Sequence, residues 1–66
     1  MSYSINDREG VAWEFNEAGV CKWDASAMDF TTPMSDAELR KFVYGSGARR
    51  VTAAEAEAFA RSHASP

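Results

Sequence analysis

The residues best suited to chemistry are two adjacent arginines, Arg49 and Arg50, in the stretch YGSGARRV. Guanidinium groups carry paired N–H donors that match the oxygen atoms of a phosphate or a carboxylate. The helix expected just after them begins with unpaired backbone N–H groups, which also attract anions. We therefore predict an anion-binding or partner-binding surface here, which three neighbouring residues extend: Arg40, Lys41 and Tyr44.

The same stretch also has a purely structural interpretation. Its two glycines permit a flexible turn between helices, and its arginines can pair with acidic residues elsewhere. The pattern G-x-x-x-x-G-K-[ST] of a phosphate-binding loop is absent from the sequence. The connector is also longer than the turn of a helix-turn-helix, and the following helix presents mostly alanine and glutamate instead of base-reading side chains. Nucleic acid is therefore not the expected partner, and binding to its backbone is kept as an alternative function.

Charge is distributed unevenly along the chain. The net charge of −3 is the balance between −6 in residues 1–38 and +3 in residues 39–66. The two halves can lie side by side and neutralise each other, or one of them can attract an oppositely charged partner. A third interpretation is an acidic decoy, in which residues 1–38 imitate nucleic acid and occupy a basic protein groove.

Catalytic and metal-binding patterns are missing. One cysteine, Cys21, and one histidine, His63, cannot form a zinc site without further ligands. The sequence has no H-E-x-x-H pattern, no nucleophile elbow and no dinucleotide-binding glycine pattern. We predict a protein that is not an enzyme and has no cofactor. The lone thiol, with no signal peptide and no membrane-spanning run, favours the cytoplasm and excludes a membrane partner.

The amino-terminal half predicts a β-hairpin. The stretch VAWEFNEAGVCKWD alternates apolar and polar residues on both sides of NEAG, which indicates strands at 11–15 and 20–24. Asn16 suits the start of a type I turn, and Gly19 suits the bulge that follows a three-residue loop. A short edge strand at 2–6 would complete a meander of two to three strands.

The three-residue loop fixes the pairing of side chains across this hairpin. It places Trp13 opposite Trp23 on an apolar face and Glu14 opposite Lys22 on a polar face. A shift of the register by one residue would separate both pairs, because neighbouring residues of a strand point to opposite faces.

Residues 25–33 have no clear pattern. Met28 and Phe30 can extend the preceding strand after a bulge, form a further short strand, or belong to a loop that fills the core. Pro33 ends any strand in this segment and favours an extended conformation for the residue before it. These three alternatives remain open at this point.

The carboxy-terminal half predicts two α-helices, at about 36–44 and 53–63. Each begins with a capping box, in which a Ser or Thr and a Glu three residues later bond reciprocally: MSDAE and VTAAE. We therefore predict a single α+β domain spanning residues 1–66. Its meander half comprises residues 1–32, its helical half comprises residues 33–66 with a tail at 64–66, and both helices pack on one face of the sheet.

These features favour a small non-enzymatic module that binds another protein. A chain of 66 residues forms a small core, so a second protein or a second copy is expected to cover part of its apolar surface. A homodimer is accordingly a further prediction. The candidate apolar interface consists of four residues: Trp13, Trp23, Met28 and Phe30.

Overall fold

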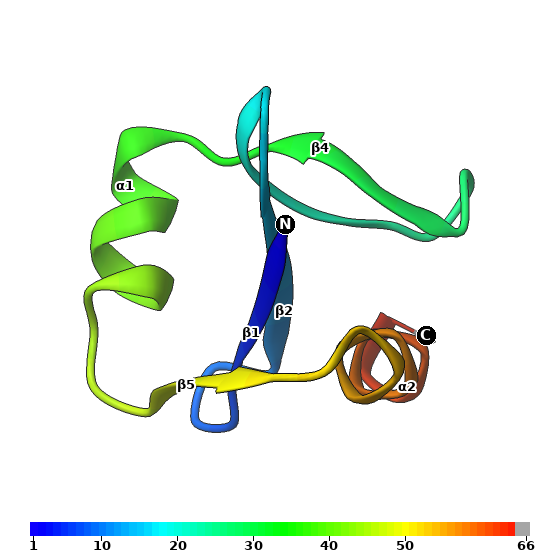
Figure 1. The fold of residues 1–66 in the computed structure, drawn as a ribbon. Helices are drawn as coiled ribbons and strands as arrows, with labels where there is room; N and C mark the ends of the chain where they lie inside the picture. Colours follow the sequence, from blue (N-terminus) through cyan, green and yellow to red (C-terminus); the bar gives the residue numbers. More distant parts are fainter. Residues whose placement is uncertain (65–66) are drawn as a thin grey trace.

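The fold is a five-stranded antiparallel sheet with a helical segment on either side (Figure 1). The computed structural model describes residues 1–64. Its strands lie in the order β4-β3-β2-β1-β5. They span β1 Ser2–Asn6, β2 Val11–Asn16, β3 Gly19–Asp24, β4 Asp29–Pro33 and β5 Ala48–Val51. The α+β class is confirmed, whereas the predicted two to three strands are too few, since β5 was not expected and β4 was only one of three alternatives left open for residues 25–33.

Both helices begin at their predicted capping boxes. Helix α1, Asp36–Glu38, continues directly into the π-helical segment η1, Leu39–Val43, and helix α2 spans Ala53–Ala64. In the first box, the Ser35 hydroxyl accepts a hydrogen bond from the Glu38 backbone N–H, and the Glu38 carboxylate accepts one from the Ser35 N–H. The predicted tail at 64–66 lies, beyond Ala64, outside the described residues.

The π-helical turn distinguishes the first helical segment from the α-helix predicted at 36–44. The Tyr44 N–H donates to the Leu39 carbonyl, 3.0 Å away, which is a spacing of five residues instead of four. Such turns occur mostly as local insertions within α-helices. The prediction was right about the existence and position of the helix and wrong about its hydrogen-bond pattern.

The two helical segments cover opposite faces of the sheet (Figure 1). On one face, Ile5 belongs to the core that α2 covers. On the other, the Asn6 side-chain amide donates to the Phe42 carbonyl of η1. Neighbouring residues of β1 thus point to different helices, as strand geometry requires. The prediction that both helices pack on one face was wrong. We refer below to the α2 face and the η1 face of the sheet.

The main core lies between α2 and the sheet. Its buried members are Ile5, Ala12, Phe30, Ala56 and Ala60. Alanines on α2 allow the helix to approach the strands closely, and Phe30 fills the remaining space with edge-on aromatic contacts. Its ring centroid lies 5.5 Å from that of Tyr3 and 5.0 Å from that of Trp23. Of the alternatives for residues 25–33, the structure has the further short strand, β4.

The β2–β3 hairpin has a two-residue turn, so its predicted register was wrong by one residue. Asn16 pairs with Gly19 and Trp13 pairs with Lys22. The Asn16 side chain accepts a hydrogen bond from the Ala18 N–H at 2.8 Å, and Gly19 has a φ of +111°, which together close the tighter turn. The tryptophans therefore lie on opposite faces. Trp13 is buried on the η1 side, and Trp23 packs against Phe30 on the α2 side.

Trp13 provides a test of the packing beneath η1. It is only 1% exposed, and its Nε1–H has no hydrogen-bond partner among the described residues. Replacement by phenylalanine removes this unpaired donor and leaves a small cavity, two effects of opposite sign. We expect Trp13→Phe to lower the free energy of unfolding by less than about 2 kcal/mol, and Trp13→Ala by about 3–5 kcal/mol. Urea denaturation measures both, and equal losses would contradict this account.

Candidate functional site

The two candidate arginines lie on strand β5, not on a flexible connector. Arg49 pairs with Ile5 and Arg50 pairs with Ser4 of β1. Since neighbouring residues of a strand point to opposite faces, the side chain of Arg49 lies on the α2 face and that of Arg50 on the η1 face. The structure therefore does not bring the two guanidinium groups together around one anion.

Arg49 is engaged within the domain. Its Nε lies 2.7 Å from Oδ2 of Asp7, in the turn between β1 and β2. The hydrogen bond from Arg49 lowers the pKa of Asp7. This ion pair joins the acidic amino-terminal half to the basic carboxy-terminal half, as expected from the first of the three interpretations of the charge pattern, in which the halves neutralise each other.

Arg50 has a different environment. It takes part in none of the four ion pairs found within residues 1–64. It borders an open hollow of about 610 Å³ over the ends of β1 and β2. We call this the Arg50 hollow, and its lining consists of Met1, Ser2, Phe15, Asn16, Glu17 and Arg50. In the hollow, the unpaired guanidinium group of Arg50 thus lies near the apolar side chains of Met1 and Phe15.

The remaining basic candidates belong to η1 and its end. Lys41 Nζ lies 3.8 Å from Oε1 of Glu9, and Arg40 forms no ion pair with the described residues. The side chain of Tyr44 is 78% exposed. These three residues lie in the helical segment that covers the η1 face, so they share that side of the sheet with Arg50.

The start of α2 offers little to an anion. The Thr52 hydroxyl accepts a hydrogen bond from the Glu55 N–H at 3.1 Å, and the Thr52 carbonyl accepts one from the Ala56 N–H at 2.9 Å. The Glu55 carboxylate in turn accepts a hydrogen bond from the Thr52 N–H at 3.2 Å. The capping box thus uses the Glu55 N–H, one of the backbone groups that the sequence analysis considered for binding, and the Glu55 carboxylate would repel an incoming anion.

The structure does not bring the apolar candidates together on one surface. Trp13 and Phe30 are 1% and 6% exposed, on opposite sides of the sheet. Trp23 is half-buried on the α2 face, with the guanidinium group of Arg61 5.7 Å from its ring centroid. Met28 is 50% exposed, in the turn before β4. Only Met28 therefore presents a large apolar surface, and the other three act mainly in packing.

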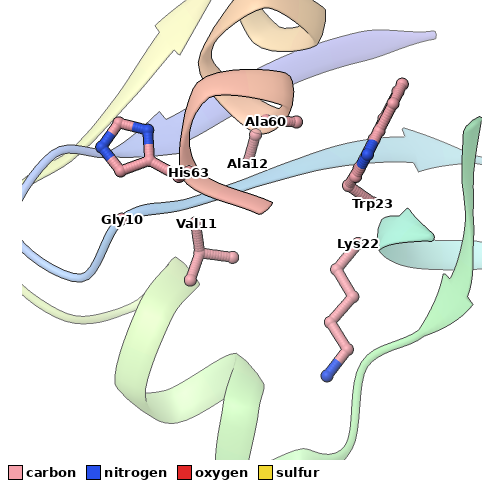
Figure 2. Close-up of a pocket in the computed structure, with 7 residues that line it drawn as sticks. All are labelled: Gly10, Val11, Ala12, Lys22, Trp23, Ala60 and His63. Atoms are coloured by element: carbon pink, nitrogen blue, oxygen red, sulfur yellow. The ribbon is translucent and has the colours of Figure 1, made fainter. Parts of the chain in front are cut away.

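A second opening lies where β2 and β3 separate (Figure 2). Their pairing ends at Trp13 and Lys22. The side chains of Lys22 and Trp23, which are neighbours on β3, point in opposite directions, as strand geometry requires. The opening has a volume of about 270 Å³. Its polar side chains have partners, since Lys22 pairs with Glu38 and His63 Nδ1 lies 2.9 Å from the Phe59 carbonyl. It therefore lacks the free convergent polar groups expected of a small-molecule site.

Glu38 makes the stability of the η1 side dependent on pH. A hydrogen bond from Lys22, followed by one from the Ser35 N–H, lowers the pKa of Glu38. A carboxyl whose pKa is lower in the folded state stabilises the fold above its unfolded pKa of about 4, and this contribution is lost as the pH falls through the folded value. We expect Glu38→Gln to be less stable than the parent at pH 7 and to lose less stability on acidification.

Urea denaturation at neutral and acidic pH measures this difference. Glu17, exposed in the β2–β3 turn, provides a matched control, because it forms no ion pair with the described residues. Glu17→Gln should follow the parent at both pH values. Equal acid sensitivity of Glu38→Gln and the parent would contradict the role given to Glu38.

The fold and the site define a small α+β domain with an arginine-bearing edge strand and helices on both sides of its sheet. Comparison of the chain with protein-family models, with curated proteins and with solved structures found no match. Between residues 1 and 64, no helix is long and apolar enough to cross a membrane.

Proposed function

We propose that this domain is a non-enzymatic module that binds an acidic region of another protein through the Arg50 hollow. The observation that carries the proposal is an unpaired, exposed arginine beside apolar side chains in an open hollow. A carboxylate of the partner would pair with Arg50, and an apolar group beside that carboxylate would contact Phe15 and Met1. The apolar contact matters, since an exposed ion pair alone contributes only about 0–1 kcal/mol.

Arg50 contributes the cationic side chain of the hollow, whose lining also includes the carboxylate of Glu17. Four other cations have a carboxylate partner: Lys22 with Glu38, Lys41 with Glu9, Arg49 with Asp7 and Arg61 with Glu57, while Arg8 and Arg40 form no ion pair within residues 1–64. Arg50 has no carboxylate partner either, so the carboxylate of a bound protein would not have to displace one from within the domain.

Binding in the cytoplasm, which the lone thiol favours, is part of this proposal.

Charge reversal at Arg50 tests the proposal. The probe is a short synthetic peptide in which valine alternates with glutamate, titrated into the labelled protein and followed by NMR. We expect binding to the parent, a loss of affinity of about tenfold or more for Arg50→Glu, and little binding of a matched valine–lysine peptide. Arg40→Glu is the control, because Arg40 also lacks an ion pair but does not line the hollow.

Two results would contradict the proposal: unchanged affinity of Arg50→Glu for the acidic peptide, or equal binding of the basic peptide. Binding of a single-stranded oligonucleotide that weakens steeply with salt would favour the alternative of nucleic-acid-backbone binding. Binding of a basic protein through residues 1–38 would favour the acidic decoy. Light scattering tests the predicted homodimer separately.

A further inference from the structure

We infer that the partner contributes an extended segment that joins the sheet as a sixth strand along the outer edge of β5. This inference rests on the proposed function and specifies the conformation of the acidic region. An acidic side chain of the added strand would lie beside Arg50 on the η1 face, while main-chain hydrogen bonds to β5 would hold the segment in register.

The outer edge of β5 is open. The strand is the last in the sheet order, and within residues 1–64 it pairs with β1 alone. Ala48, Arg49 and Arg50 are all exposed. An edge of this kind presents a row of unpaired backbone N–H and C=O groups, which are the groups that an added strand uses.

The opposite edge, β4, is less suitable. A bulge disturbs its pairing with β3, and it ends at Pro33, which has no backbone N–H to donate. Met28, the residue before the first residue of β4, has a φ of +55°, so the chain turns sharply where β4 begins. Bulges and prolines are common features of edges that do not accept another strand.

Charge determines which strand can join β5. Arg49 and Arg50 stand next to each other on a strand of four residues. A second copy of β5 would bring two unpaired Arg50 guanidinium groups together, in addition to two Arg49 groups that each pair with Asp7. Like charges directly opposite each other destabilise a strand pair. An acidic segment would have the opposite effect. The edge is thus protected against self-pairing by charges that favour an acidic partner.

The alternation of side chains indicates the pattern of the partner. Arg50 lies on the η1 face, whereas Val51, half-buried, lies on the α2 face. The residue of the added strand beside Arg50 is expected to be acidic. Its neighbour along that strand would point to the α2 face, beside Val51, and is expected to be apolar. A segment in which acidic and apolar residues alternate satisfies both positions.

Amide hydrogen exchange on the full chain tests this inference with the valine–glutamate peptide. Saturating peptide is expected to slow exchange of the outward-pointing amides of β5 by about tenfold or more, with no such change in β4. A second peptide has the same side chains and N-methyl groups at alternate residues, which removes donors from one edge. We expect it to bind about 30-fold more weakly, equivalent to the loss of two backbone hydrogen bonds.

The possible failures are distinguishable. Strand addition is overturned, while the proposed function stands, if three results occur together. Both peptides bind equally, Arg50→Glu weakens the binding of both, and the β5 amides exchange as fast with peptide as without it. If neither peptide binds the folded parent protein, strand addition and the proposed function are both overturned. Circular dichroism of each variant shows whether a loss of binding comes from unfolding.

Discussion

Replacing Asn6 by alanine is expected to lower the free energy of unfolding by about 3 kcal/mol, because three backbone groups lose their hydrogen-bond partner. Asn6 is fully buried at the end of β1. Its amide nitrogen donates to the carbonyls of Phe42, at 3.0 Å, and Ser46, at 3.3 Å. Its side-chain oxygen accepts from the Glu9 N–H at 3.0 Å. One side chain thus joins the β1–β2 turn, η1 and the segment that leads to β5.

The loss is large for a domain of this size. A chain of 66 residues has a total stability of about 3–10 kcal/mol. Asn16→Ala is the matched control, since Asn16 also bonds to a nearby backbone N–H but lies at the hairpin turn, half-buried. It should cost about 1 kcal/mol in the same urea titration. Similar losses at the two positions would contradict the central role of Asn6.

Asn6→Asp gives the same position a distinctive pH dependence. The carboxylate still accepts from Glu9 N–H but faces two carbonyls to which it cannot donate, so its folded-state pKa should exceed the unfolded value of about 3.9. A raised folded pKa adds stability below the unfolded value, and this contribution is lost as the pH rises through the folded one. The difference in the free energy of unfolding between Asn6→Asp and the parent should therefore become smaller as the pH is lowered.

Gly47→Ala is the second substitution with a large expected effect. Gly47 has a φ of +99°, and an added Cβ would lie 2.9 Å from Oδ1 of Asn6 and 3.2 Å from Cβ of Arg8. The positive φ costs about 1–2 kcal/mol for a residue with a side chain. The contact with Asn6 adds to this cost, because moving Oδ1 weakens its hydrogen bond to Glu9. We expect a total loss of about 3 kcal/mol in urea denaturation.

Gly19 separates the two contributions. It also has a positive φ, +111°, but no atom lies within 4 Å of the position that a Cβ would occupy. Gly19→Ala should therefore show the backbone cost alone, about 1–2 kcal/mol. If Gly47→Ala costs no more than Gly19→Ala, the close approach to Asn6 does not contribute.

The parts of the fold that the sequence predicted well are those set by neighbouring residues. The hairpin strands and both capping boxes depend on contacts within a few positions, and all are present in the structure. Strand β5 was missed because its four residues include two arginines and no alternation of apolar residues. Its conformation comes from pairing with β1, at the other end of the sequence. Local propensity carries no information about such pairing.

The hairpin register and the placement of the helices were wrong for a related reason. Both predictions assumed a sheet with one apolar and one polar face, and Trp13 and Trp23 were assigned to the apolar one. In the structure each face has its own helical cover, so each tryptophan is packed on a different side. A polar asparagine, Asn6, occupies the end of β1 and links it to η1. Nothing in the sequence around Asn6 indicates a buried role.

Of the residues that line the Arg50 hollow, the sequence analysis named only Arg50 as a candidate for binding. Arg50 was among the residues expected to bind a partner, but its separation from Arg49 follows from strand alternation, which the sequence analysis did not foresee. Phe15 and Met1 were not connected with Arg50, since they adjoin it only after β5 pairs with β1. No pattern within the sequence indicates that Met1, Phe15 and Arg50 lie close together in the fold.

The origin of the Arg50 hollow has a consequence for the order of events during synthesis. The hollow needs Met1 from the start of the chain, Phe15 from β2 and Arg50 from the last strand. The β1–β5 pairing closes a loop of more than 40 residues, and such distant contacts form late in folding. A nascent chain that has not yet emerged past β5 therefore lacks the surface that we propose for partner binding. On this proposal, the partner would bind only chains that have completed the β1–β5 pairing, and not chains that are still being synthesised.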